Sequence, residues 1–202
     1  LSTVALTAII VVSYVLFHAI STINGDLIVN LDEYKENQNQ TSFIYAYDKN
    51  GNTVELARLH GEEDRVWVDL DDMSPYMADA FIALEDERFR SHSGVDWIRT
   101  IGVIVVPQNI GQGGSTITQQ LIKNLTGENA GTFVRKYREI KNALALEKHF
   151  DKDEILEAYL NTIYLDMGCY GIKTGAEYYF NKDVSDLTLM ESAILASITK
   201  AP

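Results

Sequence analysis

The stretch SPYMADAFIALEDERF, residues 74–89, predicts the first long helix of the chain and carries its most unusual carboxylate. Ser74 is a favoured N-cap and Pro75 a favoured first helical residue, so the pair predicts where the helix starts. Apolar residues then recur three or four positions apart, at Ala78, Phe81, Ile82 and Phe89. Glu85 lies on this apolar face, whereas residues 86–88 are expected to point progressively away from it.

A carboxylate placed against phenylalanine rings loses hydration, and its affinity for a proton rises. Glu85 is therefore a candidate general base for a reaction near neutral pH. A plainer interpretation is that Glu85 lies at the exposed edge of the core or pairs with a neighbouring arginine. The apolar pattern alone leaves both interpretations open.

The rest of the pattern is mainly helical, with one β-hairpin. Residues 42–47 and 52–59 are rich in β-formers and flank the sequence DKNG, which is typical of a turn. Asp151 and Glu154 have the spacing of a capping box at the start of another helix. Two further helices are expected to pack through apolar residues at helical spacing: Phe133, Tyr137, Ile140 and Leu144 in one, and Leu189, Ile194 and Leu195 in the other.

Residues 1–23 contain no Asp, Glu, Lys or Arg and are long enough to cross a ~30 Å hydrocarbon layer as a helix. A cleaved signal peptide is the alternative, but the apolar run exceeds the ~7 to 15 residues of a signal core. We expect a transmembrane helix over residues 1–23, a polar juxtamembrane connector over residues 24–41 and one ordinary domain over residues 42–202.

The net charge of −12 argues against a nucleic-acid partner, because such proteins need a basic face. Basic side chains are nevertheless concentrated between residues 123 and 152. This pattern indicates an anionic ligand or, for some of these residues, an ordinary solvated helix face. Cys169 is the single cysteine, so we expect a buried, inert thiol with neither a disulfide nor a cysteine metal site within the chain.

The run GGSTITQQLIKN, residues 113–124, places two glycines ahead of a hydroxyl N-cap and a helix. Free N–H groups at such a helix start favour an anion, and glycine allows its close approach. Lys123 follows Gln119 by four residues, so it can add a positive charge on the same side. Most Gly-Gly-Ser helix starts are only caps, and the full run is the more specific signal.

In the helix expected from Phe133, the side chains of Arg135, Arg138 and Glu139 project opposite the apolar stripe, and Lys136 flanks them. One interpretation is pairing within the helix, such as Arg135 with Glu139, worth ~0.3 to 0.5 kcal/mol when exposed. The other is a clamp for a pyrophosphate, with Glu139 as a second functional carboxylate.

Four blocks resemble, in the same order, the motifs of the peptidoglycan glycosyltransferases, glycosyltransferase family 51: residues 83–96, 113–124, 135–139 and 152–161. The resemblance extends over roughly residues 43–202 and implies a lysozyme-like helical domain anchored outside the cytoplasmic membrane. Such a domain polymerises lipid II into glycan strands by inverting transfer and releases undecaprenyl pyrophosphate. It occurs in class A penicillin-binding proteins and in monofunctional transglycosylases. The implied partners are lipid II, the growing lipid-linked strand, the membrane and other cell-wall synthesis proteins.

The resemblance also implies roles for single residues. Glu85 matches the general base for the acceptor 4-hydroxyl, and Glu139 matches a second essential carboxylate near the donor pyrophosphate. The other matches are expected to bind substrate: Asp86, Ser115, Gln119, Gln120, Lys123, Arg135 and Lys136. A divalent cation, Mg or Mn, is a candidate aid to the pyrophosphate, although no residue pattern defines a metal site. Gly131 stands where the family often has a further cation.

Two other functions compete with this one. A lysozyme-like hydrolase or lytic transglycosylase would share a glutamate on a helix, but it has no pyrophosphate to hold and no need of cations at positions 123, 135 and 136. A non-catalytic, membrane-tethered scaffold would have no reason to retain both Glu85 and Glu139.

Overall fold

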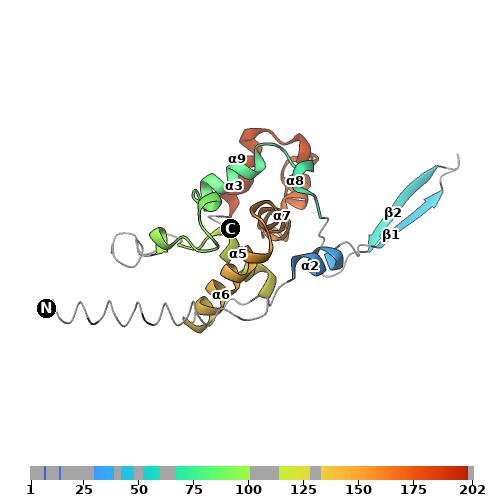
Figure 1. Ribbon diagram of the computed structural model, residues 1–202. Coiled ribbons are helices and arrows are strands. Elements are labelled where there is room, and N and C mark those ends of the chain that lie inside the picture. Colours follow the sequence, from blue (N-terminus) through green and yellow to red (C-terminus); the bar gives the residue numbers. More distant parts are fainter. Residues whose placement is uncertain are drawn as a thin grey trace.

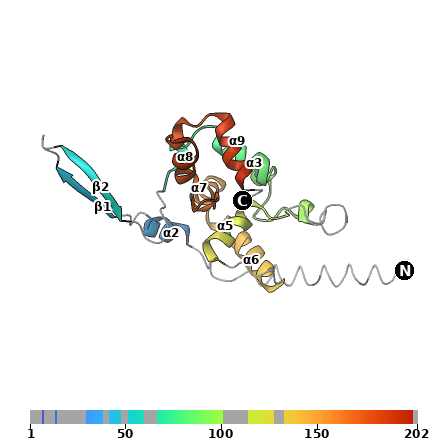
Figure 2. The ribbon, with the colours of Figure 1, turned by 180° about the vertical axis from the view of Figure 1, so that it is seen from behind.

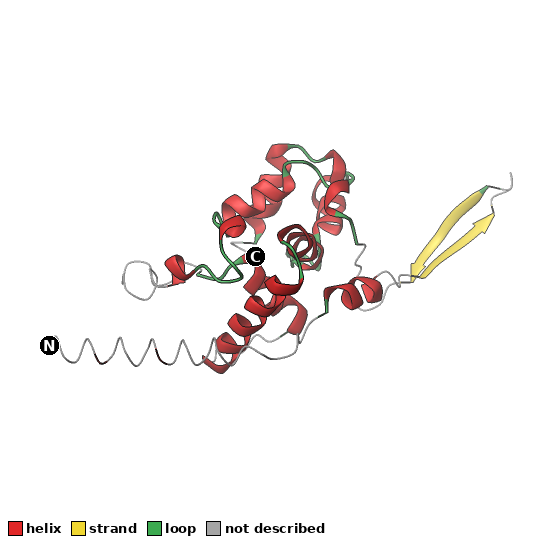
Figure 3. Ribbon diagram, viewed as in Figure 1, coloured by secondary structure: helices red, strands yellow, loops and turns green. Residues whose placement is uncertain are grey.

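The computed structural model describes residues 30–38, 42–47, 52–59, 67–100, 114–127 and 133–199, with Thr7 and Tyr14 as isolated positions. The helices are α2 (Leu31–Gln38), α3 (Met77–Glu85), α5 (Ile117–Thr126), α6 (Phe133–His149), α7 (Lys152–Thr162), α8 (Ile172–Phe180) and α9 (Leu189–Ile198). Short 3₁₀ helices are η1 (Leu70–Asp72), η2 (Phe89–Ser91) and η4 (Val184–Asp186), and the strands are β1 (Ser42–Tyr47) and β2 (Thr53–Leu59). The described part of the chain is mainly helical with one small sheet, as predicted, and is consistent with a lysozyme-like fold (Figure 3).

The hairpin is confirmed on both sides of its predicted turn. β1 and β2 pair in antiparallel fashion, from Ser42 opposite Leu59 to Tyr47 opposite Thr53. The predicted turn at residues 48–51 lies outside the described residues. The sheet extends away from the helical body, and α2 lies between the two (Figure 1).

The N-terminal region contains a helix where a polar connector is predicted. The predicted transmembrane helix over residues 1–23 falls outside the described residues apart from its two isolated positions. None of the helices in the described ranges combines the length and apolar character that crossing a bilayer requires. Within the predicted connector, α2 buries Leu31, and Lys35 Nζ donates to Asp69 Oδ1 at 2.8 Å and to Glu157 Oε1 at 2.9 Å. These contacts bind α2 to the helical body.

Helix α7 lies at the centre of the helical body, with α5 and α6 on one side and α3, α8 and α9 on the other (Figures 1 and 2). The predicted capping box at its start is confirmed, because the Asp151 side chain accepts from the Glu154 N–H at 2.9 Å and Glu154 accepts from the Asp151 N–H at 2.7 Å. Its buried residues surround the helix: Ile155, Leu156, Ala158, Tyr159, Leu160, Asn161 and Thr162. A helix buried on all sides is expected at the centre of a bundle.

The buried face of α6 differs from the predicted stripe. Tyr137 is exposed, whereas Glu139, Ala143 and Leu146 are buried. The backbone at this buried face is in close contact with the loop at Gly94, and the absence of a side chain on Gly94 permits the contact. A Cβ atom on Gly94 would lie 2.6 Å from the Ala143 carbonyl oxygen, so the loop containing Gly94 passes directly over this part of α6. A pattern of large apolar residues does not reveal a contact of this kind.

The prediction for α9 is correct for one of its three residues. Leu195 is fully buried, but Leu189 and Ile194 are exposed. The buried face of α9 also includes two small residues, Ser192 and Ala196. Small side chains thus form part of the buried surface of α9, a helix that packs against α3 (Figure 1).

Helix α3 begins at Met77, later than the predicted start at Ser74. The Ser74 hydroxyl donates instead to the Leu187 carbonyl oxygen at 2.6 Å, and the N-cap is Tyr76. The helix ends at Glu85, and the backbone of Asp86 leaves the helical conformation with φ −154°. The helical spacing therefore does not extend beyond Glu85. Phe89 is nevertheless buried and Glu87 exposed, as predicted, whereas Asp86 is buried, contrary to the prediction.

Candidate active site

Glu85 is the last residue of α3 and is buried, as its place on the apolar face predicts. Both of its carboxylate oxygens accept hydrogen bonds from distant parts of the chain. Gln120 Nε2 of α5 donates to Oε2 at 2.8 Å, and Thr199 Oγ1, directly after α9, donates to Oε1 at 2.6 Å. Arg99 Nη1 donates to the main-chain oxygen of Glu85 at 2.7 Å. The carboxylate is thus held in one orientation from two sides.

The Gln120 amide is itself oriented by α7. Tyr159 Oη donates to Gln120 Oε1 at 3.3 Å, which directs the Gln120 amide nitrogen toward Glu85. Burial raises the pKa of Tyr159, and the charges of Glu85 and Asp86 raise it further, so its hydroxyl keeps its proton and remains a donor. The sequence pattern indicates Tyr159 only as a core residue, because a buried aromatic at helical spacing has no mark of a polar role.

Asp86 turns inward, contrary to the prediction that it points away from the core. It is 1% exposed. Its Oδ2 accepts from the Ile117 N–H at 2.9 Å and lies 2.9 Å from His92 Nε2. Because the helix ends one residue earlier, Asp86 faces the start of α5 rather than solvent. Its predicted contact with substrate stays a prediction.

The start of α5 is closed by the protein's own side chains. Thr116 is the N-cap, and Thr116 and Gln119 form a capping box in which each side chain accepts from the backbone N–H of the other. The next N–H, that of Ile117, is taken by Asp86. These three amides are already hydrogen-bonded within the protein and are not free to bind an anion, whereas the wider prediction of an anion site at this helix start stays a prediction. Gln119, predicted to bind substrate, is 1% exposed and caps the helix.

A second carboxylate, Glu139 on α6, lies among cations. Arg135 Nη1 donates to Glu139 Oε2 at 2.6 Å, and Lys136 Nζ donates to the other carboxylate oxygen. Lys136 also donates to Ser115 Oγ at 2.9 Å, which ties α6 to the residues preceding α5. The pairing of Arg135 with Glu139, which sequence analysis weighs against a ligand clamp, is therefore present. Glu139 is buried, and its carboxylate orients the side chains of Arg135 and Lys136.

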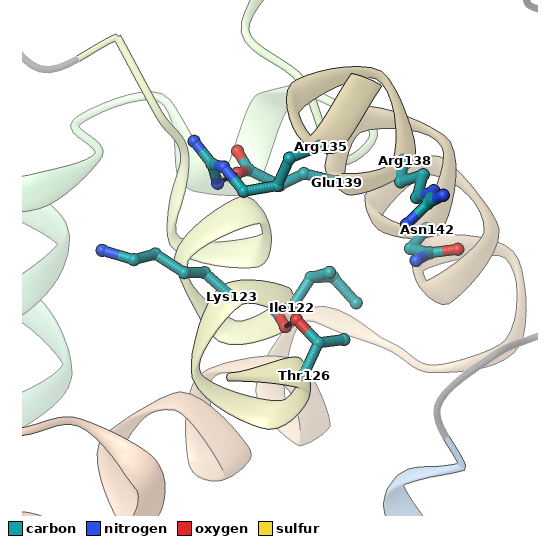
Figure 4. Close-up of a pocket in the computed structure, with 7 residues that line it drawn as sticks. All are labelled: Ile122, Lys123, Thr126, Arg135, Arg138, Glu139 and Asn142. Atoms are coloured by element: carbon teal, nitrogen blue, oxygen red, sulfur yellow. Dashed lines mark hydrogen bonds and ion pairs between the residues drawn. The ribbon is translucent and has the colours of Figure 1, made fainter. Parts of the chain in front are cut away.

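A pocket of about 190 Å³ opens between α5 and α6 (Figure 4). Seven residues line it: Ile122, Lys123, Thr126, Arg135, Arg138, Glu139 and Asn142. The ends of Lys123 and Arg135 extend toward the same side of the pocket, away from Arg138 (Figure 4). Three cations and one carboxylate give the pocket a net positive charge. Lys123 is exposed and makes no ion pair with any residue in the described ranges, so its charge is available to a ligand.

Helix α5 contacts both the buried Glu85 carboxylate and the cationic pocket. Gln120 holds Glu85, and Lys123 lines the pocket. These two residues are three positions apart and are neighbours on the helix surface. The site therefore places a candidate base beside a candidate anion site, with Ser115, Gln120, Lys123, Arg135 and Lys136 at the positions between or around them. Thr199 and Tyr159 are the contacts that sequence analysis missed.

Two other features give no sign of a metal or redox centre. No group of three or more His, Cys, Asp or Glu side chains in the described ranges is placed to hold a metal ion. Cys169 is buried, as predicted. Burial raises the pKa of Cys169, and the charge of Asp166 adds to this effect, so the thiol is poorly reactive.

A helical domain with a buried carboxylate next to a cationic pocket is suited to group transfer from an anionic leaving group. Residues 51–202 match the family model described as Transglycosylase, and the chain belongs to this family. Comparison with curated proteins agrees with this assignment and points to penicillin-binding proteins.

Penicillin-binding protein 1F of Bacillus subtilis is 44% identical over 159 residues, which cover 77% of this chain and 22% of that protein. Penicillin-binding protein 1A of Escherichia coli is 45% identical over 151 residues, or 73% of this chain and 18% of that protein. Penicillin-binding protein 1A of Clostridium perfringens is 43% identical over 171 residues, which cover 81% of this chain and 25% of that protein. The chain spans a quarter or less of the length of these relatives.

Proposed function

We propose that the chain is a membrane-anchored peptidoglycan glycosyltransferase that polymerises lipid II into glycan strands on the extracytoplasmic face of the membrane. The observation that carries this proposal is the placement of Glu85 and the cationic pocket along one side of α5. The family assignment and the similarity to penicillin-binding proteins support it. The apolar residues 1–23 are the proposed anchor.

The proposed reaction needs one group to activate the nucleophile and another to stabilise the leaving group. A Glu85 carboxylate oxygen takes the proton from the 4-hydroxyl of the acceptor sugar. The acceptor oxygen then attacks the anomeric carbon of the lipid-linked donor on the face opposite the pyrophosphate. The bond from that carbon to the pyrophosphate oxygen breaks, its electron pair leaves with undecaprenyl pyrophosphate, and the configuration inverts.

The cations of the pocket would stabilise the negative charge that develops on the departing pyrophosphate. Lys123 and Arg135 extend toward one side of the pocket, and Glu139 holds Arg135 and Lys136 in place (Figure 4). Glu139 would thus act by orienting two cations. Because its carboxylate is already paired with both, the described donor set of the pocket does not fit a resident divalent cation. No step of the mechanism is assigned to such an ion.

The test is lipid II turnover by the full chain, with the substitution Glu85→Gln. We expect a loss of at least about 10²-fold in rate with the fold retained, because glutamine cannot accept the proton. Glu87→Gln is the matched control, since Glu87 is exposed two residues further along. Wild-type turnover in the Glu85 variant would refute the proposal.

The phosphate role is tested separately with Lys123→Ala. We expect donor affinity to fall about tenfold or more, because a charge-assisted contact to phosphate is lost. Lys148→Ala is the control, since Lys148 is also exposed but lies near the end of α6, away from the pocket residues. Equal donor affinity in the two variants would refute the proposal that Lys123 binds the pyrophosphate.

A further inference from the structure

Thr199 joins the end of α9 to the candidate base. It is the first residue after the helix, and its Oγ1 lies 2.6 Å from Glu85 Oε1, a residue 114 positions earlier in the chain. Distances of about 2.5 to 2.7 Å are typical of a hydroxyl that donates to an ionised carboxylate. The contact between Thr199 Oγ1 and Glu85 Oε1 lies within this range.

The Thr199 hydroxyl has a second acceptor within reach. Its Oγ1 lies 2.7 Å from the Ala196 carbonyl oxygen. A hydroxyl has one proton to donate and lone pairs that accept, so it can satisfy only one of these two acceptors at a time. While Glu85 is charged, the proton points to the carboxylate, which is the stronger acceptor. Once Glu85 carries a proton, the hydroxyl can turn toward Ala196 and accept from the carboxyl group.

Several charged or titratable groups face this region from the surrounding elements. Arg99 donates to the Glu85 main-chain oxygen. Asp86, which follows Glu85 in the chain, contacts His92. From α7, Tyr159 reaches Gln120, which holds the other carboxylate oxygen. Thr199 is the neutral donor of this set that contacts Oε1 directly and can adapt to both protonation states of Glu85.

We propose that Thr199 is a positioning residue for Glu85: its hydroxyl holds Oε1 and stays hydrogen-bonded to the carboxyl group before and after proton transfer. The inference rests on the proposed function, since it requires Glu85 to act as the base. It assigns a role to the end of α9, a segment that the sequence motifs leave without one. The orientation of Glu85 would then depend on the packing of α9 against α3.

The test compares Thr199→Val, which has nearly the same shape without the hydroxyl, with Thr199→Ser, which keeps it. Polymerisation of lipid II by the full chain is measured for kcat and KM across the pH range. In Thr199→Val, the acidic limb of the pH profile of kcat should move to higher pH by about 0.5 to 1 unit. The reason is that the Thr199 hydroxyl binds the charged carboxylate of Glu85 more strongly than its protonated form, so its loss disfavours the charged form. On that limb kcat falls about threefold to tenfold, with KM unchanged.

Thr199→Ser should restore the wild-type profile. Ser197→Ala is the matched control in the same last turn, because the exposed Ser197 hydroxyl donates only to Ile194 O among the described residues, at 2.7 Å. A purely structural role for Thr199 would lower kcat evenly at all pH values and leave the limb in place, which would overturn the inference. The inference would also be overturned if the acidic limb moved in Thr199→Val and remained moved in Thr199→Ser.

The two proposals fail in different ways. If the wild-type chain forms polymer, Glu85→Gln does not, and Thr199→Val has the wild-type profile, only the role of Thr199 is refuted. If the wild-type chain forms no polymer, or Glu85→Gln is fully active, the proposed function is refuted and the role of Thr199 with it.

Discussion

The carboxylate of Asp86 accepts a hydrogen bond from the backbone N–H of Ile117, with 2.9 Å between Oδ2 and the nitrogen. This bond joins the residue that follows α3 to the first residue of α5. A negative charge at a helix N-terminus is stabilising, and this one is buried. The contact matters for the site because Glu85 precedes Asp86 and Gln120 follows Ile117 by one turn, so the cap sets the distance over which Gln120 reaches Glu85.

Replacing Asp86 with alanine should destabilise the protein by about 1 to 3 kcal/mol, because the buried Ile117 N–H would lose its acceptor. Urea unfolding of the Asp86→Ala variant measures this. Glu87→Ala is the control: the side chain is exposed, and its loss should change stability by no more than about 0.5 kcal/mol. Equal unfolding midpoints for the two variants would contradict a capping role for Asp86.

Two glycines with positive φ allow a second stability test. Gly94 has φ +88°, and a Cβ atom there would lie 2.6 Å from the Ala143 carbonyl oxygen, whereas Gly127 has φ +65° and open space around it. Gly127→Ala should cost about 1 to 2 kcal/mol, from backbone conformation alone. Gly94→Ala should cost more, by at least about 1 kcal/mol, because loop and helix backbones must also separate.

Gly94→Ala should lower activity as well, since the Gly94 carbonyl oxygen accepts from the Thr116 hydroxyl at 2.7 Å and so positions the N-cap of α5. Denaturant unfolding and lipid II turnover of both variants provide the measurements. A greater loss of stability in Gly127→Ala than in Gly94→Ala would contradict a close contact between the Gly94 loop and α6.

Removing the Tyr159 hydroxyl should affect activity more than stability. In Tyr159→Phe, the Gln120 amide loses the donor that orients it and can present its oxygen to Glu85. We expect kcat to fall about threefold to tenfold while stability falls by about 1 kcal/mol, the typical contribution of one hydrogen bond. Tyr178→Phe, at a 59% exposed side chain, is the control. An unchanged kcat would show that Gln120 keeps its orientation without Tyr159.

The start of α9 provides a pH-dependent prediction. A hydrogen bond from Lys182, together with those from the Thr188 backbone and side chain, lowers the pKa of Glu191 from 4.5 to about 2. Because the folded-state pKa lies below the unfolded value, Glu191 contributes stability above pH 4.5, and this contribution is lost as the pH falls toward 2.

Unfolding of the wild type and of Glu191→Gln should be compared from neutral to acidic pH. The difference in their free energies of unfolding should be constant above about pH 5 and shrink between pH 4.5 and 2. A difference that stays constant throughout this window would show that the bonds from Lys182 and Thr188 to Glu191 add no pH-dependent stability in solution.

Much of the local structure is predictable from the sequence. The hairpin strands, the Asp151 capping box and the burial of Glu85 all follow from residues a few positions apart. The concentration of cations on α6 is also visible in the sequence, including the spacing that pairs Arg135 with Glu139. These features depend on periodicity and on short-range hydrogen bonds, which a single segment encodes by itself.

By itself, then, the sequence determined the helical class, the hairpin and the residues that bear charge at the site. Only the tertiary structure decided that Tyr137 faces solvent, that Asp86 caps a helix 31 residues away and that Thr199 reaches Glu85 across 114 residues. The physical reason is that side-chain burial and long-range hydrogen bonds are set by how whole helices pack against one another. Glycines such as Gly94 allow close approaches of this kind, and the spacing of large apolar side chains within one helix does not record them.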